Sequence, residues 1–221
     1  MRETSHSQSR PDLLNDPILP TLKKMTIPMI FGMVTLMMFN IVDTFFISML
    51  GTEPLAAVSF TFPVTFTVIS LAIGLGIGTS AVIAKALGSN KIEEARFDAS
   101  VSLIVALLLV ILLSFIGYLL IDPIFTLLGA GQLVLPLIHE YMNIWFIGSV
   151  FLITPMIGNS VLRASGDTKT PSIVMGGAGL INAILDPILI FGWGPVPALG
   201  IQGAAIASVI GGGYDRDHTR L

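Results

Sequence analysis

The sequence contains no cysteine, which excludes disulfides, thiolate catalysis and cysteine-ligated metal sites. It has only three histidines, His6, His139 and His218, and they are scattered over tail and loop positions, so a histidine metal site is not expected. Charged residues make up 11% of the chain, whereas a soluble domain has about a quarter. The charges are also clustered, which leaves long uncharged runs. With a mean hydropathy of +0.88, the 221 residues predict an all-α, polytopic membrane helix bundle.

The uncharged runs predict five complete spanning helices and part of a sixth. We expect spans at residues 25–50, 55–86, 95–121, 136–162 and 172–192, followed by a partial span at 201–210. Residues 1–21 are too polar for the apolar core of a secretory signal and are interpreted as a cytoplasmic arm. Residues 122–131 predict a loop or a short surface helix. Residues 211–221 form an atypical polar tail.

The basic residues favour one side of the membrane. Nine of them precede the first span or follow the second and fourth, whereas the loops after the first, third and fifth spans hold none. By the positive-inside rule, this pattern predicts a cytoplasmic N-terminus and a multi-pass protein of the cell inner (plasma) membrane.

Two spans carry a carboxylate together with an amide. Asp186 follows Asn182 by four residues, and Asp43 follows Asn40 by three, so each pair shares one helical face. Pro187 removes the helical hydrogen-bond partner of the Ala183 carbonyl and allows a bend there. A charge inside the membrane is costly, so such acids indicate a functional site.

The predicted topology places both acids at one depth. Asp43 and Asp186 lie near the outer ends of two outward-running helices, about 10 Å below the outer surface at 1.5 Å per residue. This arrangement indicates a proton or cation site whose acids titrate as a pair. The alternative for Asp186 is a helix cap at the membrane surface. An intramembrane aspartyl protease is a further alternative, but its Tyr-Asp and Gly-x-Gly-Asp signatures are missing, because Val42 precedes Asp43 and Leu185 precedes Asp186.

Five motifs in order resemble the multidrug and toxic compound extrusion (MATE) transporters, in particular their DinF-like branch. The resemblance covers residues 22–210 and rests on Asn40-Ile-Val-Asp43 with Leu50-Gly-Thr-Glu-Pro-Leu-Ala-Ala57, Ala86-Leu-Gly88 with Glu94-Ala-Arg96, Leu162-Arg-Ala-Ser-Gly-Asp167, Asn182-Ala-Ile-Leu-Asp186, and Leu199-Gly-Ile-Gln-Gly-Ala-Ala-Ile-Ala207. The family has two six-helix lobes, and this chain resembles the N-terminal lobe, with its sixth helix incomplete.

The resemblance implies a transporter rather than an enzyme: a proton- or sodium-coupled antiporter that exports organic cations or drugs. It implies no cofactor beyond the coupling ion, which could be Na⁺ at Asp43 and Asp186, and no nucleic-acid partner. The expected partners are cationic small molecules, the lipid bilayer and a missing C-terminal lobe. A flippase for lipids or polysaccharide precursors is the alternative within the same superfamily.

The resemblance also assigns residues. Asp43 and Asp186 correspond to the coupling acids, Asn182 to a neighbouring ligand, and Tyr141 to an aromatic residue of the same site. Pro28 corresponds to the proline whose bend is proposed to accompany protonation, and Asn40 joins the expected site because it shares a helical face with Asp43. Phe39 and Ala204 depart from the family, because polar groups can occur at both positions.

Three local expectations complete the sequence analysis. Asn90 and Glu93 resemble a capping box that opens the third span. The alternating glycines Gly74, Gly76 and Gly78 favour close helix packing. Asp167 is expected to cap a helix or to pair with a nearby basic residue.

The end of the chain predicts that these 221 residues do not transport by themselves. The sixth apolar run has ten residues, whereas about twenty are needed to cross a bilayer. The abrupt change to a polar tail is interpreted as a truncation, a frameshift or an annotation fragment.

Overall fold

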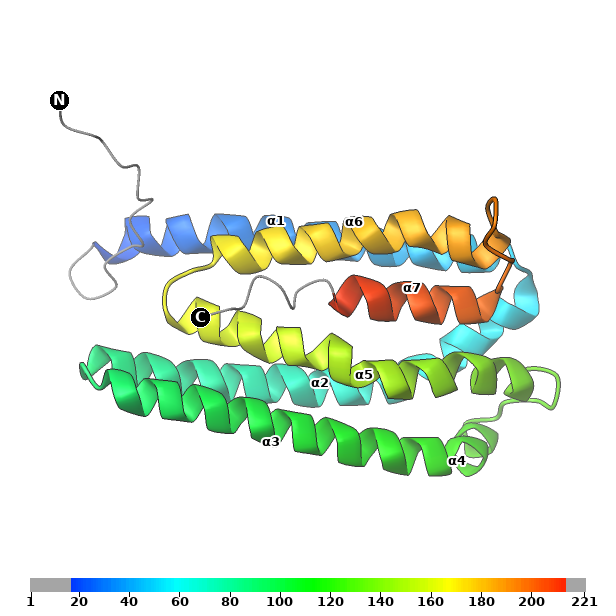
Figure 1. Ribbon diagram of the computed structural model, residues 1–221, viewed down its shortest axis with the longest axis horizontal. Helices are drawn as coiled ribbons and strands as arrows, with labels where there is room; N and C mark the ends of the chain where they lie inside the picture. The colour runs from blue at the N-terminus through cyan, green and yellow to red at the C-terminus, as the bar shows by residue number, and fades with distance from the viewer. Residues whose placement is uncertain (1–16, 214–221) are drawn as a thin grey trace.

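A computed structural model describes residues 17–213, in which the regular elements are seven α-helices (Figure 1). In chain order they are α1 (Ile18–Ser48), α2 (Thr52–Gly88), α3 (Ile92–Leu119), α4 (Ile121–Leu127), α5 (Leu135–Ala164), α6 (Lys169–Phe191) and α7 (Ile201–Gly213). Five of them, α1, α2, α3, α5 and α6, are long and apolar enough to cross a membrane. A helix satisfies its own backbone hydrogen bonds, which lipid cannot do. The predicted all-α membrane bundle is confirmed.

The ends of the helices refine the predicted segments. α1 begins at Ile18 and so takes in the last residues of the predicted arm. Pro17 and Pro20 permit this early start, because the first backbone N–H groups of a helix have no helical partner to lose. α7 continues to Gly213 and includes the first three residues of the predicted tail. Residues 1–16 of the arm and 214–221 of the tail lie outside the described residues.

The predicted capping box is wrong, because Asn90 terminates α2 and does not open α3. Asn90 has a φ of 59°, its N–H donates to the Leu87 carbonyl at 3.0 Å, and the Lys91 N–H donates to the Ala86 carbonyl at 2.9 Å. These two bonds form a Schellman motif. α3 then begins after Lys91 without a side-chain cap. At the start of α6, by contrast, Asp167 acts as a cap, since its Oδ1 accepts the Thr170 N–H at 3.0 Å.

The helices form two layers with α7 between them (Figure 1). α1 packs mainly on α6, whereas α2 and α3 pack mainly on α5. α7 contacts both layers at positions without a side chain: Gly203 lies against the Leu189 backbone of α6, and Val209 lies against Gly148 of α5. The short α7 therefore joins the α1–α6 pair to the rest of the bundle.

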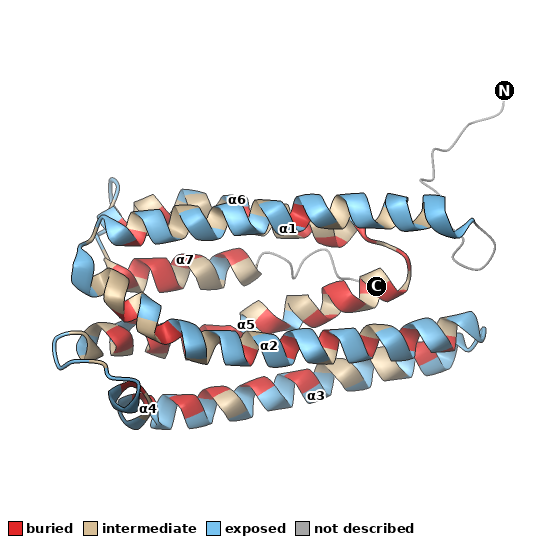
Figure 2. Cartoon of the chain, turned by 180° about the vertical axis from the view of Figure 1, so that it is seen from behind, coloured by how far each residue is buried: buried red, intermediate tan, exposed pale blue. Residues whose placement is uncertain are grey.

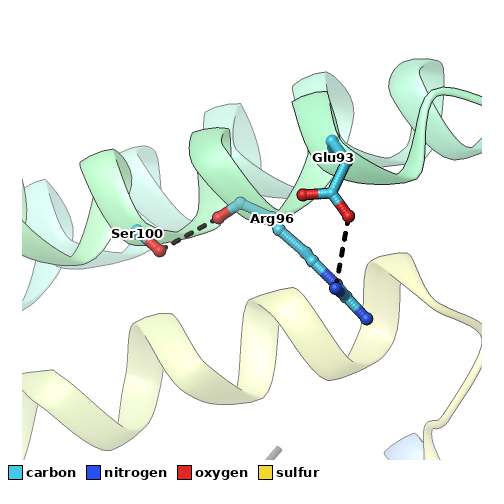
Figure 3. A network of polar contacts seen from close by, with 3 residues as sticks. All are labelled: Glu93, Arg96 and Ser100. Atoms are coloured by element: carbon cyan, nitrogen blue, oxygen red, sulfur yellow. Dashed lines mark hydrogen bonds and ion pairs between the residues drawn. The ribbon is translucent and has the colours of Figure 1, made fainter.

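The described charges divide the bundle into two ends. The seven described basic residues lie near the starts of α1, α3 and α6 and near the ends of α2 and α5, and these helix ends meet at the end of the bundle drawn on the left of Figure 1. They are Lys23, Lys24, Lys85, Lys91, Arg96, Arg163 and Lys169. Figure 3 shows part of this end, where Arg96 Nη1 lies 3.3 Å from Glu93 Oε1 and the Arg96 carbonyl accepts the Ser100 hydroxyl. Such exposed pairs add little stability. They do mark an end of the bundle that lies in water.

Figure 2 shows exposed residues along much of each long helix, and many of these residues are large and apolar. Large side chains such as Leu108, Leu112 and Phe115 of α3 are exposed, as expected for helices whose solvent is lipid. The main buried cluster includes Phe125, Met142, Trp145, Ile190 and Ile201. The short helix α4 is anchored there by Phe125, which confirms the short-helix alternative for this segment.

Candidate functional site

The two acids are brought together by close packing between α1 and α6. Gly32 of α1 lies against Ser172, and the ring of Phe39 lies against Gly179 of α6. With the helices this close, the carboxyl groups of Asp43 and Asp186 come within hydrogen-bonding reach of each other. The predicted pair thus forms one cluster in the structure.

The acid pair has few hydrogen-bond donors. Asp186 is fully buried and Asp43 is partly buried, and Asn182 Nδ2 donates to Asp186 Oδ1 at 3.4 Å. Within the described residues, no hydrogen-bond donor reaches Asp43 Oδ1 or Asp186 Oδ2 if both groups are ionised, although both oxygen atoms are buried. Two carboxylates repel, whereas one proton between them makes each group the partner of the other. Another cation between the two groups would reduce the repulsion in the same way.

Tyr141 and Ser208 extend the cluster across the bundle. Tyr141 of α5 is buried and lies near both acids, and its hydroxyl lies within hydrogen-bonding reach of Ser208 on α7. Sequence reasoning missed Ser208. A signal was present, because Ser208 follows Ala204 by four residues and so shares its helical face. Ser208 thus carries a hydroxyl one helical turn after Ala204, the position at which the resemblance allows a polar group.

Asn40 does not join the acid pair. Its side chain is exposed and donates to the Leu36 carbonyl one turn back, at 2.9 Å. It lines a separate, open groove between α1 and α2, together with residues such as Thr44, Phe45 and Leu55. Asn40 and Asp43 therefore project from α1 toward different surroundings, although they are only three residues apart.

The two prolines lie inside continuous helices. α1 passes through Pro28, and α6 passes through Pro187 directly after Asp186. Each proline removes one backbone donor from its helix and thereby weakens it locally. The cap alternative for Asp186 is excluded, because Asp186 lies fully buried within α6, well past its first turn.

The described residues contain no group of three or more His, Cys, Asp or Glu side chains that could hold a metal ion. A sodium ion at the acid pair would need further oxygen ligands from Asn182, Tyr141 or the backbone. Of these, Asn182 directs its nitrogen, not its oxygen, at Asp186.

Residues 28–188 match the MatE family profile. The chain belongs to the MatE family. The matched part includes Asp43, Tyr141, Asn182 and Asp186, so the acid cluster lies within the shared region. The resemblance noted in the sequence is therefore confirmed, and the intramembrane protease alternative is not supported.

Three known proteins are similar to this chain. It is 47% identical over 202 residues to the "FAD transporter" of Shewanella oneidensis, covering 91% of this chain and 45% of that protein. It is 35% identical over 161 residues to the "Probable multidrug resistance protein YoeA" of Bacillus subtilis, covering 73% of this chain and 35% of that protein. The crystal structure of the Vibrio cholerae MATE transporter VcmN in the bent form superposes with a TM-score of 0.85 at 38% identity, covering 90% of this chain and 45% of that one.

This MatE chain thus spans less than half the length of the relatives that it matches. The superposition on VcmN over nearly the whole chain confirms the predicted fold, the N-terminal lobe of a MATE transporter, in which α7 is a shorter apolar helix of 13 residues.

Proposed function

We propose that this chain is the N-terminal lobe of a cation-coupled antiporter that exports organic cations or drugs. The observation that carries the proposal is the acid pair, in which Asp186 is fully buried and Asp43 partly buried. Their carboxyl groups lie within hydrogen-bonding reach of each other, and Asn182 donates to Asp186. A membrane protein retains such a costly pair where the charge is used for transport. Membership of a transporter family supports the same function.

The coupling ion that fits best is a proton. Joint ionisation of two close acids is disfavoured, so the pair retains one proton. The proton leaves when a cation displaces it or when the surroundings of the pair change. Proton uptake from the outside would bias the transporter from its outward-open to its inward-open state. Binding of a cationic cargo would bias it the other way, because the cation and the proton compete for the same negative charge. Na⁺ is the alternative ion.

FAD is a second candidate cargo. It is favoured by the 47% identity to the Shewanella oneidensis FAD transporter, which exceeds the 35% identity to the Bacillus subtilis multidrug resistance protein. We further propose that the protein lies in the cell inner membrane with its N-terminus in the cytoplasm, since the basic ends of the helices gather on one side.

The test uses a complete transporter in which this chain replaces the matching N-terminal part of the Shewanella oneidensis relative. Inverted vesicles are given a pH gradient or a Na⁺ gradient, and uptake of FAD and of a fluorescent organic cation is measured. We expect uptake with the pH gradient and its loss in Asp43→Asn and in Asp186→Asn, with membrane insertion unchanged. Glu53→Gln, an exposed acid at the start of α2, is the matched control. Normal uptake by either Asn variant would remove that acid from the coupling mechanism.

A further inference from the structure

Arg163, in the last turn of α5, is half-buried, whereas the other described basic residues are exposed. The ion pairs within the described part of the chain join Lys91 to Glu94, Arg96 to Glu93 and His139 to Asp122, and Arg163 belongs to none of them. Burial removes water from a charged group, so an anion or several hydrogen-bond acceptors must take the place of that water. Arg163 is therefore a cation in need of an anionic partner.

Ser160 fixes the position of the Arg163 guanidinium. Arg163 Nη2 donates to Ser160 Oγ at 2.7 Å. Ser160 is 2% exposed, and its own hydroxyl hydrogen is used in a bond to the Met156 carbonyl at 2.9 Å. The contact between α5 and α2 holds Ser160 in turn, because Ser80 Oγ donates to the Ser160 carbonyl at 2.8 Å and Gly76 leaves room for the Ser160 side chain. The guanidinium thus rests on a rigid support.

The acid that follows Arg163 most closely in the sequence is engaged at the next helix. The Gly166 N–H donates to the Arg163 carbonyl at 3.1 Å, and the Asp167 N–H donates to the Leu162 carbonyl at 3.0 Å, which forms a Schellman motif at the end of α5. Beyond this turn, Asp167 Oδ1 accepts the Thr170 N–H at 3.0 Å and Oδ2 accepts the Thr170 hydroxyl at 2.7 Å. Both carboxylate oxygens therefore serve the start of α6.

The chemistry of the guanidinium defines the ligand that it would bind. Arginine stays protonated, and its planar N–H groups match the paired oxygens of a phosphate or a carboxylate. Ser160 occupies one of these N–H groups, which leaves the others for a ligand. Phosphate is the anion of the lipid headgroups beside the basic ends of membrane helices, and it is also part of FAD. The acid pair cannot bind such a group, because Asp43 and Asp186 would repel it.

We propose that Arg163, oriented by Ser160, forms a phosphate-binding site at the basic end of the lobe. The phosphate has two possible sources, the exported cargo and the headgroup of an anionic lipid. For the cargo, the inference rests on the proposed export function and extends the substrates to phosphate esters. Ser160 acts as a positioning residue, since it holds the guanidinium and leaves the phosphate contacts to Arg163.

The first arm of the test measures cargo binding without any ion gradient. The purified transporter, with this chain as its N-terminal lobe, is titrated with riboflavin and with FMN, which differ by one phosphate group, and flavin fluorescence is followed. If the cargo supplies the phosphate, Arg163→Gln should weaken FMN binding at least about tenfold, the effect of losing a charged hydrogen bond, and leave riboflavin binding unchanged. Arg163→Lys, which keeps the charge but not the planar fork, should restore only part of the FMN affinity.

The second arm measures lipid binding. The same protein is placed in vesicles of phosphatidylcholine alone or mixed with the anionic lipid phosphatidylglycerol, and its thermal unfolding temperature is measured. If a lipid supplies the phosphate, the anionic lipid should raise the unfolding temperature of the unsubstituted protein, because a ligand of the folded state stabilises it. Arg163→Gln should remove this rise, and Ser160→Ala should reduce it.

Arg96→Gln is the matched control in both arms, because Arg96 lies at the same end of the bundle but is exposed and paired with Glu93 (Figure 3). An effect of Arg163→Gln on FMN alone assigns the site to the cargo, and an effect on the lipid-dependent rise alone assigns it to a headgroup. The proposal is overturned if Arg163→Gln changes neither quantity, or if Arg96→Gln changes them as much. Ion-driven uptake that persists in that case would leave the proposed export function intact.

Discussion

The ring of Phe39 on α1 occupies the space in which Gly179 of α6 would otherwise carry a side chain. The two helices bearing the acids can approach only because one contact residue is a glycine and the other fills the gap. Phe39 departs from the polar groups that the resemblance allows at this position. The departure has a structural role, since the ring packs on the helix that carries Asn182 and Asp186.

Gly179→Ala should therefore separate α1 from α6. A methyl group at this position collides with the Phe39 ring, and overpacking of this kind costs about 1–3 kcal/mol. We expect a lower thermal unfolding temperature of the purified transporter and reduced ion-coupled uptake. Gly176→Ala, three residues earlier on α6, is the matched control, because a Cβ there meets no atom within 4 Å. Equal losses in the two variants would contradict a specific contact between α1 and α6.

Replacing Asn182 and replacing Asn40, the two amides predicted for the site, should have different effects on transport. Asn182 donates to Asp186, whereas Asn40 donates to its own helix and lines the open groove between α1 and α2. Asn182→Ala should impair ion-coupled uptake, because a buried carboxyl loses its donor, at a cost of about 1–3 kcal/mol. Asn40→Ala should alter cargo affinity and leave the pH dependence of uptake unchanged. A changed pH dependence in Asn40→Ala would place this residue in the coupling site after all.

The fold was predictable from the sequence because a lipid environment permits few backbone structures. A long uncharged run in a bilayer forms a helix, so the five spans follow from hydropathy. Local geometry was less accessible. Asn90 fits a capping box by residue type, but its left-handed backbone ends the preceding helix instead. Likewise, of Gly74, Gly76 and Gly78, only Gly76 meets a neighbouring residue, Ser160, because alternate residues do not share a helical face.

The candidate site was predictable in part for a similar reason. Asp43 and Asp186 were found because a carboxylate in an apolar run is conspicuous, and the helix pairing then brought them together. Asn40 was misplaced relative to the acids, because sequence spacing gives the face of a helix and not the neighbour that this face meets. Ser208 was missed because a serine in an apolar helix usually bonds its own backbone and so carries little signal.

Ser208 provides the third prediction. If its hydroxyl holds that of Tyr141 beside the acids, Ser208→Ala should reduce ion-coupled uptake about fivefold, the effect of losing one hydrogen bond worth about 1 kcal/mol. The pH at which uptake is half-maximal should also move, a change that a purely structural role would not produce. Ser208→Thr should restore both values. Ser100→Ala on the exposed start of α3 is the control, and an effect as large there would contradict the assignment.

The orientation of the chain provides the last prediction, and the absence of cysteine makes it easy to test. Lys169 begins α6 at the basic end of the bundle, whereas Trp193 lies in the loop between α6 and α7 and is 73% exposed. A single cysteine at Trp193→Cys should react with a membrane-impermeant thiol reagent on intact cells. Lys169→Cys should react only after the cells are made permeable, because the basic end faces the cytoplasm. Reporter fusions after Lys169 and within residues 192–200 should report the same two sides. The opposite labelling would invert the topology and place the acid pair nearer the cytoplasm, so that the coupling proton would enter from that side.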